Sequence, residues 1–219
     1  MTRHVRDHFV QQAQRDGYLS RAAYKLEEIC TKDKSLLTKS TFVFDIGSAP
    51  GSWTQLACEI VGAGVLDKRV VAVDLLPMKS LPVGAQFLQG DFTAREVQMN
   101  LLSLLSEADQ TRAPDAKALT QLCVLSDMRS NTSGQKGLDH ARQIELCENV
   151  LNFSLEAQHV CENIFGAKFR YALVVKATMG EDFDALRNQI RQVFRVLRIV
   201  KPKSSRRSSP ELYIVAKSW

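Results

Sequence analysis

The sequence has few of the features that define disulfide-stabilised, metal-binding or membrane-spanning proteins. Its five cysteines are odd in number and lie singly along 219 residues with no CxxC pair, so they predict buried thiols in a reducing compartment, with neither a disulfide framework nor a zinc site. No apolar run approaches the ~20 residues that cross a bilayer. The first residues lack the hydrophobic centre of a secretory signal, and Asp7 and Asp16 argue against a mitochondrial presequence, so we expect this segment in the mature protein.

Acidic residues are in modest deficit, with 24 Asp and Glu against 29 Lys and Arg and a net charge of +5. The basic excess is concentrated in residues 1–25 and in the span 201–207, which contains four basic residues and no acid. The content of hydrophobic residues, 45%, is that of an ordinary globular protein with a sizeable core. Basic segments that flank a neutral core indicate a polyanionic partner.

The stretch 42–56, FVFDIGSAPGSWTQL, predicts a buried strand, a turn of small residues and a helix. Gly47 and Gly51 stand four apart with Pro50 between them, so the Gly-x-Gly-x-x-Gly spacing that cradles a pyrophosphate is absent. A turn that allows close backbone approach without that cradle suits a nucleoside with an amino-acid tail, such as S-adenosylmethionine. The same pattern also fits an ordinary tight turn in an α/β protein.

Six more strands are predicted, at 69–75, 85–88, 122–126, 171–175, 196–200 and 212–216, with helices over 94–106, from about 138 to 163, and over 182–194. Acids end or follow three of these strands, at Asp74, Asp91 and Asp127, and Lys176 follows a fourth. Such an alternation predicts a Rossmann-like, doubly wound α/β sheet of seven strands whose ligands lie along the carboxyl edge. The last two strands have no helix between them and should pair antiparallel in an otherwise mostly parallel sheet of the methyltransferase type, with helices on both faces.

We expect one domain over residues 1–219, without repeats. Residues 1–40 would form a helical segment that contributes to the RNA-facing and active-site surface, with two short helices around Gly17, and residues 41–219 would form the cofactor-binding and catalytic core. Local pattern alone describes Lys25 as a solvated helix lysine. The polar stretch 107–120 is the best candidate for an exposed loop.

The chain resembles the FtsJ/RrmJ family of ribosomal RNA 2'-O-ribose methyltransferases, in its bacterial type or the mitochondrial counterpart. The resemblance covers nearly all of residues 9–216 and rests on VQQAQRDGYLSRAAYKL, DIGSAPGSW, VDLLPM, FLQGDF, the SDM segment with its following Asn and Ser-Gly, and the closing ELYIVA. It implies that the catalytic Lys-Asp-Lys-Glu tetrad of the family falls on Lys25, Asp127, Lys176 and Glu211.

The resemblance also implies a cofactor and a substrate. S-adenosylmethionine would contact Gly47, Ser48, Ala49, Pro50, Gly51, Trp53, Asp74, Leu75, Asp91, Phe92 and Asp127, and no metal is expected. RNA would contact Arg21, Lys201, Lys203, Arg206 and Arg207. The implied substrate is a ribose, that of a uridine, in large-subunit ribosomal RNA within a pre-ribosomal particle. We expect a monomer, in the cytoplasm of a bacterium or the mitochondrial matrix of a eukaryote.

The tetrad fits the chemistry that the resemblance implies. A ribose hydroxyl is a poor nucleophile and the sulfonium methyl group is already activated, so the enzyme must supply in-line placement and remove one proton. The family assigns Lys176 as the proton acceptor, oriented by Asp127, with Lys25 and Glu211 positioning the ribose. Burial and Lys25 favour the neutral amine of Lys176, whereas Asp127 and Glu211 favour its ammonium form, and the sequence leaves this balance open.

Two segments depart from the family pattern. After Asp127 the chain reads Met-Arg-Ser-Asn where the family usually has Met-Ala-Pro-Asn, and after Lys176 it reads Ala-Thr-Met-Gly where an aromatic usually precedes the glycine. These changes motivate an alternative, a ribosome-assembly factor that binds ribosomal RNA with weak or lost catalysis. A methyltransferase for proteins or small molecules would explain the cofactor motifs but not the basic ends.

Overall fold

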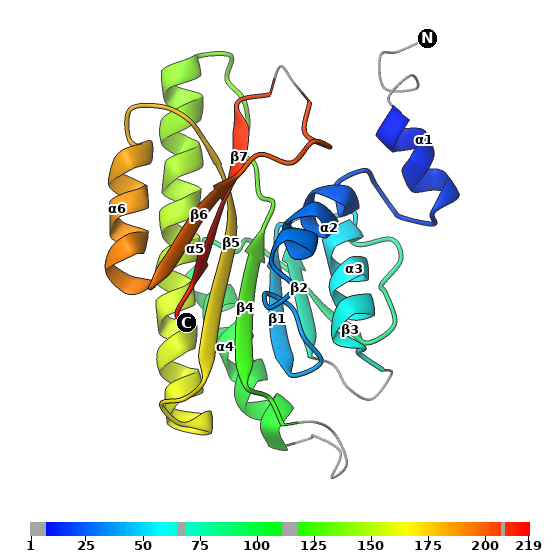
Figure 1. Cartoon of the computed structure of the whole chain (residues 1–219), viewed down its shortest axis with the longest axis vertical. Helices are drawn as coiled ribbons and strands as arrows, with labels where there is room; N and C mark the ends of the chain where they lie inside the picture. The colour runs from blue at the N-terminus through cyan, green and yellow to red at the C-terminus, as the bar shows by residue number, and fades with distance from the viewer. Residues whose placement is uncertain (1–7, 65–68, 111–117, 207–208) are drawn as a thin grey trace.

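The computed structural model describes residues 8–64, 69–110, 118–206 and 209–219. Seven strands and six helices alternate along this part of the chain (Figure 1). The strands are β1 (Thr41–Ile46), β2 (Val70–Asp74), β3 (Ala85–Gln89), β4 (Gln121–Ser126), β5 (Arg170–Thr178), β6 (Val196–Val200) and β7 (Glu211–Lys217). The helices are α1 (His8–Arg15), α2 (Ala23–Lys32), α3 (Ser52–Val61), α4 (Arg95–Gln110), α5 (Lys136–Phe165) and α6 (Phe183–Val193).

The strands form one sheet in the order β3-β2-β1-β4-β5-β7-β6. The pairs among β1 to β5 are parallel, whereas β7 lies between β5 and β6 and is antiparallel to both. The predicted doubly wound α/β sheet with an antiparallel last strand is therefore confirmed. The first strand, β1, lies in the middle of the sheet. The strand order proceeds from β1 to β3 on one side and from β4 onward on the other, so the carboxyl ends of β1 and β4 flank the switch point where such sheets bind ligands.

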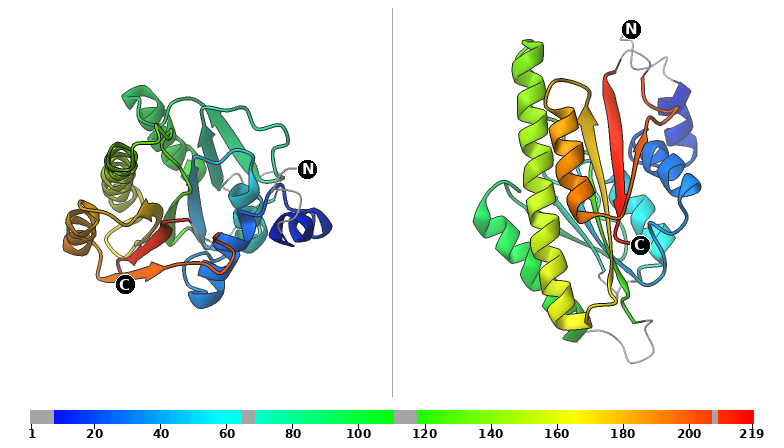
Figure 2. Two further views of the ribbon diagram at one scale, coloured as in Figure 1. Left: turned by 90° about the horizontal axis from the view of Figure 1, so that it is seen from above. Right: turned by 60° about the vertical axis from the view of Figure 1, so that its left-hand side comes forward.

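Helices cover both faces of the sheet, as the view from above in Figure 2 shows. Successive residues of a strand point to opposite faces, so Phe42 and Phe44 of β1 join the core under α4, α5 and α6, whereas Val43 between them joins the core under α2 and α3. All three side chains are completely buried. This two-sided burial explains why β1 reads as a nearly continuous apolar run and not as an alternating one.

Two boundaries, the ends of β5 and α4, differ from the prediction by three or more residues. Strand β5 was expected to end at Val175, but it continues to Thr178, because β7 pairs with it up to Glu211 opposite Thr178. Lys176 therefore lies inside the strand and not after it. Helix α4 runs four residues into the predicted loop 107–120, of which residues 111–117 lie outside the described part of the chain. Helix α5 is one continuous helix of 30 residues.

The N-terminal helices are fastened to the sheet through α3. The Trp53 indole donates to the carbonyl of Ala22 at 2.8 Å, and the hydroxyls of Ser20 and Ser52 lie 2.6 Å apart. The Ser20 hydroxyl also accepts a hydrogen bond from the amide of Ala22, the N-cap residue of α2, at 3.2 Å. These contacts place α2 beside the turn that precedes α3, where the predicted ligand edge begins.

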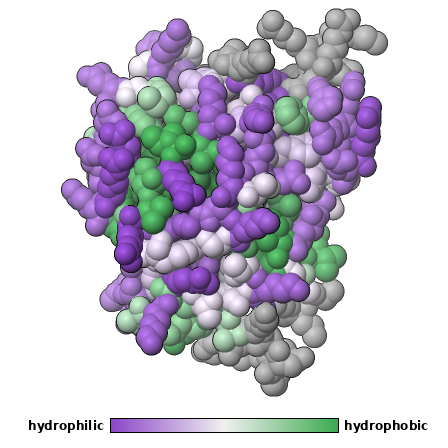
Figure 3. All heavy atoms as spheres, viewed as in Figure 1, coloured by the Kyte–Doolittle hydropathy of each residue, from purple (hydrophilic) through white to green (hydrophobic). Residues whose placement is uncertain are grey.

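Hydrophilic side chains cover most of the face drawn in Figure 3, with smaller hydrophobic areas between them. Among the described residues, no helix combines the length and the apolar character needed to cross a membrane. All five cysteines are free thiols, four of them buried and Cys30 partly buried.

Candidate active site

The turn after β1 has the backbone geometry that its glycines suggest. Gly47 and Gly51 have φ values of +76° and +114°, in the region that side chains rarely adopt. A Cβ atom on Gly47 would lie 2.3 Å from Cγ of Met128, and one on Gly51 would lie 3.0 Å from Leu19. The turn therefore packs closely against Leu19, which precedes α2, and against Met128, which follows Asp127. Neither Gly47 nor Gly51 has room for a larger side chain.

Asp74, the last residue of β2, holds this turn in place. One carboxylate oxygen accepts a hydrogen bond from the Ala49 amide and the other accepts from the Leu76 amide, both at 2.8 Å. Asp91, past the end of β3, accepts from the amide and hydroxyl of Thr93 through one oxygen. Leu75 is exposed and Phe92 is buried in the core. The carboxylates predicted to bind the cofactor thus line the edge beside the turn, and Asp74 also organises the turn itself.

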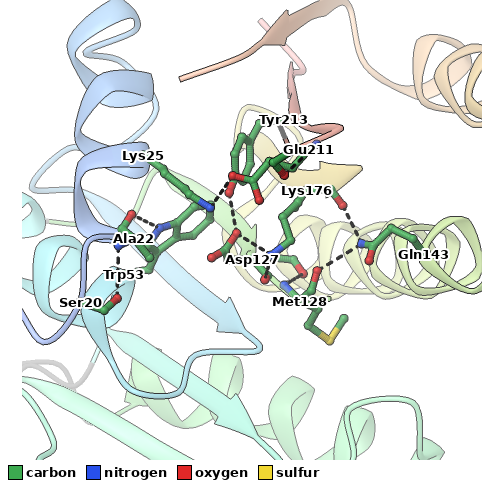
Figure 4. A network of polar contacts seen from close by, with 12 residues as sticks. Ser20, Ala22, Lys25, Trp53, Asp127, Met128, Gln143, Lys176, Glu211 and Tyr213 are labelled. Carbon is green, nitrogen blue, oxygen red and sulfur yellow. Dashed lines mark hydrogen bonds and ion pairs between the residues drawn. The ribbon is translucent and has the colours of Figure 1, made fainter. Parts of the chain in front are cut away.

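The four predicted tetrad residues come together at the carboxyl edge of the sheet (Figure 4). Nζ of Lys25 lies 2.7 Å from the Glu211 carboxylate, and Nζ of Lys176 lies 3.0 Å from the Asp127 carboxylate. Lys176 also donates to the backbone carbonyl of Asp127 at 2.5 Å. The four side chains expose between 8% and 18% of their surface, so the two ion pairs are largely removed from water.

The surroundings set the charges of this cluster. Burial opposes ionisation of Glu211, but the Lys25 ammonium and its hydrogen bond to the carboxylate outweigh it, and the pKa of Glu211 is lower than usual. Burial and the Asp127 charge raise the pKa of Tyr213 well above its ordinary value. Tyr213 therefore remains protonated, and its hydroxyl donates a hydrogen bond to the Asp127 carboxylate at 2.6 Å.

Sequence reasoning missed three residues of this site. Tyr213 fixes Asp127, and its place in the ELYIVA motif was the available signal. Gln143 of α5 donates to the carbonyls of Met128 and Lys176 and accepts from the Ser130 amide, although nothing in its sequence context marks it (Figure 4). Asp45, the single acid in the apolar run of β1, is completely buried beneath the turn.

Asp45 has an unusual environment. One of its carboxylate oxygens accepts from the Thr54 hydroxyl at 2.6 Å, and the other has no hydrogen-bond partner among the residues that the structure describes. Burial is the main cause that raises the pKa of Asp45 to about 7, against the hydrogen bond from Thr54, and the charges of Asp127 and Asp74 add to the rise. This carboxyl group is therefore poised between its neutral and charged forms near neutral pH.

The basic loop before β7 is tied to α2. The Glu28 carboxylate accepts hydrogen bonds from the amides of Lys203 and Ser204 at 2.7 and 2.8 Å, and Arg21 donates to the carbonyl of Ser204. Lys201, Lys203 and Arg206 are exposed, and Arg207 lies outside the described residues. Arg21 thus holds the loop, and the three exposed residues present the positive charge beside the tetrad. Within the described segments, no three His, Cys, Asp or Glu side chains are grouped so as to hold a metal ion.

The chain is similar to known proteins over nearly its whole length. Residues 18–219 match the model of the family described as FtsJ-like methyltransferase. The chain is 41% identical over 215 residues to the ribosomal RNA large subunit methyltransferase E of Acinetobacter baumannii, covering 98% of this chain and 88% of that protein. It is 40% identical over 216 residues to the protein of the same name from Marinobacter nauticus, covering 99% and 92%.

The fold has a counterpart among solved structures. The crystal structure of a ribosomal RNA methyltransferase from Plasmodium falciparum matches with a TM-score of 0.62 at 26% sequence identity, covering 91% of this chain and 97% of that one. The family match covers the glycine turn, all four residues of the tetrad, and strand β6 with the antiparallel strand β7. The chain therefore belongs to the FtsJ-like methyltransferase family, which confirms the resemblance seen in its motifs.

Proposed function

We propose that this protein transfers a methyl group from S-adenosylmethionine to the 2'-oxygen of a ribose in large-subunit ribosomal RNA. The observation that carries the proposal is the buried pair of Lys176 and Asp127, 3.0 Å apart, directly beside the glycine turn after β1. Family membership supports the reaction type, and the names of the bacterial relatives support the substrate.

The residues at the carboxyl edge fit S-adenosylmethionine. The positive φ values at Gly47 and Gly51 let the backbone approach a ligand closely, and Asp74 and Asp91 offer carboxylate oxygens to hydroxyl and amino donors. Trp53 and Phe92 are buried and pack in the hydrophobic cores on the two faces of the sheet. When bound, the cofactor supplies an electrophilic methyl group and leaves as a neutral thioether.

The chain's own residues would then place the ribose and accept its proton. For this step Lys176 must be the neutral amine: its N–H groups donate to the carboxylate and the backbone carbonyl of Asp127, and its lone pair at Nζ accepts the proton of the 2'-hydroxyl. Tyr213 fixes the Asp127 carboxylate from the other side. The Lys25–Glu211 pair lies next to this group and offers both a donor and an acceptor to the sugar.

The RNA surface that we propose combines residues 1–40 with the loop 201–207. Glu28 of α2 and Arg21 just before it fasten the loop, and Lys201, Lys203 and Arg206 are exposed on it. Cationic side chains at such positions neutralise phosphates without reading sequence. We expect the target to be a uridine within a pre-ribosomal large subunit, reached in the cytoplasm of a bacterium or the mitochondrial matrix of a eukaryote.

Mapping 2'-O-methyl groups on ribosomal RNA from cells with and without this protein tests the proposal directly. One ribose in the large-subunit RNA should lose its methyl group in the deletion strain and regain it when the wild-type gene is restored. An unchanged methylation map, together with binding of the protein to pre-ribosomal particles, would favour the assembly-factor alternative that the residues after Asp127 and Lys176 suggest.

A further inference from the structure

A recess with a volume of about 410 Å³ lies directly beside the tetrad on the side away from the cofactor turn. Lys176 and Glu211 form one end, and Ser130, His140, Thr178 and Met179 are among the residues that line the rest. The sheet order places β1 and its glycine turn first, then Asp127 after β4, Lys176 in β5 and Glu211 in β7. The recess therefore adjoins the reacting centre but is separate from the cofactor edge.

The walls of this recess are fixed by hydrogen bonds. Gln143 joins the Ser130 amide on one wall to the backbone carbonyl of Lys176 on another. The amide of Asp182 donates to Nε2 of His140 at 3.3 Å. A Cβ atom on Gly180 would lie 2.4 Å from that same Nε2, so only glycine lets the imidazole ring pack there. The recess is thus a built feature of the fold and not a gap between mobile side chains.

The contacts of His140 determine the role of Thr178. Because Nε2 accepts a hydrogen bond from the Asp182 amide, the imidazole carries its own hydrogen on Nδ1. Nδ1 lies 3.0 Å from the Thr178 hydroxyl oxygen, which must accept that hydrogen. In the described part of the chain, this hydroxyl has no second hydrogen-bond partner. Thr178 is therefore prepared to donate its own hydrogen to an acceptor in the recess.

We propose that the recess binds the base of the nucleotide whose ribose is methylated, and that Thr178 selects a base with a carbonyl oxygen. This inference rests on the proposed function. A ribose held at Lys176 and Glu211 has its base attached at the neighbouring carbon, so the base must occupy space next to the tetrad. The recess provides that space, and its volume lies within the range of about 300–1,000 Å³ that small-molecule sites occupy.

The chemistry of the lining agrees with an RNA base. Met179 is largely exposed beside Thr178 and offers an apolar surface for a ring to pack on. Enzymes that act on an extruded nucleotide read its base by hydrogen bonds to its edge. Uracil, cytosine and guanine carry a ring carbonyl that can accept from Thr178, whereas adenine carries none. The exposed cations Arg129 and Lys136 lie on the same recess and suit flanking phosphates.

The test compares target bases and two threonine variants. Large-subunit particles from cells that lack the enzyme are prepared with the native target nucleotide and with adenine in its place, and kcat/KM for methyl transfer is measured. One neutral hydrogen bond corresponds to about a 2- to 12-fold change. We expect the kcat/KM of wild type to be higher for the native base than for adenine by about this factor. In Thr178→Val, the kcat/KM for the native base should fall by the same factor, so that the two bases are methylated equally well.

Thr120→Val is the matched control, because Thr120 is an exposed threonine at the opposite end of β4. It should keep both the rate and the base preference. The inference is overturned if the mapped target is an adenosine, or if Thr178→Val keeps the wild-type preference. In either case methyl transfer by wild type still stands, so the failure of the inference is distinguishable from the failure of the proposed function.

A binding measurement keeps the recess testable even if wild type transfers no methyl group. Protein labelled at its methionine methyl groups is titrated with uridine 5'-monophosphate, with S-adenosylhomocysteine present to fill the cofactor edge. The Met179 resonance should shift, and that of Met99, an exposed methionine on α4, should not. A Met179 resonance that stays fixed would contradict a base-binding recess.

Discussion

Replacement of Lys176 by alanine should separate catalysis from folding. The change removes the only amine within hydrogen-bonding distance of Asp127 among the described residues, and with it the proposed proton acceptor. Loss of a general base lowers rates by ~10² to 10⁴-fold, so we expect methyl transfer to fall by at least about 10²-fold. S-adenosylmethionine affinity should be nearly unchanged, because among the described residues the hydrogen bonds of the Lys176 amine go to Asp127 and not to the turn from Gly47 to Gly51.

The structure also limits the cost of this substitution in stability. Breaking a fully buried ion pair destabilises by about 3–5 kcal/mol when it leaves a charge without a partner. Here the Asp127 carboxylate keeps the hydrogen bond from Tyr213 and remains partly exposed, so we expect a loss of about 1–3 kcal/mol. The folded variant should therefore remain available for assay.

The assay is single-turnover transfer of a labelled methyl group to under-methylated large-subunit particles, with enzyme in excess. Lys217→Ala is a matched control, because Lys217 is an equally buried lysine whose Nζ lies 2.6 Å from Asp33 at the other end of β7. It should lose comparable stability, measured by urea unfolding, and keep its rate. A full rate in the Lys176 variant would refute the assignment of the base, and an equal loss of rate in both variants would trace the defect to folding.

Three further outcomes are expected. Asp74→Ala should weaken binding of S-adenosylmethionine about tenfold or more in calorimetry, since it removes a charged acceptor worth ~1.5 to 3 kcal/mol and also frees the Ala49 amide of the turn; equal affinities would remove Asp74 from the cofactor contacts. Replacing the four basic residues of 201–207 with serine should flatten the salt dependence of RNA binding, because each neutralised phosphate contributes about −0.7 to −0.9 to the slope, whereas an unchanged slope would place the RNA surface elsewhere. Burial raises the pKa of Asp45 to about 7, above its unfolded value of ~3.9. Between these two pH values the folded protein binds a proton at Asp45 that the unfolded chain has lost, so the free energy of unfolding should fall as the pH rises from ~3.9 to about 7. Asp45→Asn cannot ionise, so its urea midpoint should depend less on pH between 5 and 8, and an identical dependence in both proteins would contradict the buried-acid explanation.

Local pattern was sufficient to predict the sheet and to predict that the glycine turn and the acids expected to bind the cofactor lie at one edge of it. The glycine turn and the acids at Asp74 and Asp127 lie next to apolar runs whose ends the sequence marks, so their meeting at one edge follows from parallel strand order. Lys176 was placed just past its strand because the run of β-formers ends at Val175. The pairing of β5 with β7 continues beyond that run, and such pairing is not visible in either segment alone.

The tetrad itself required the family resemblance. Lys25 and Glu211 are 186 positions apart, and the local pattern of α2 described a solvated lysine, whereas the structure buries it in an ion pair. The attachment of the basic loop to α2 through Glu28 was also hidden, because it depends on backbone amides that any sequence would offer. Asp45, by contrast, could have been identified, since a lone acid in a buried strand needs a reason.

The position of β7 has a consequence for how the enzyme is made. This strand is the last in the sequence but is inserted between β5 and β6, where it places Tyr213 across from Lys176 and supplies Glu211 for Lys25. A nascent chain that has not yet delivered residues 211–217 has neither the acid that pairs with Lys25 nor the hydroxyl that fixes Asp127. Domains can begin to fold during synthesis, but here the proposed active site can be assembled only after β7 has left the ribosome. Catalytic competence therefore arrives with the final strand, and truncated products of translation that stop before it should be inactive whatever else of the sheet they form.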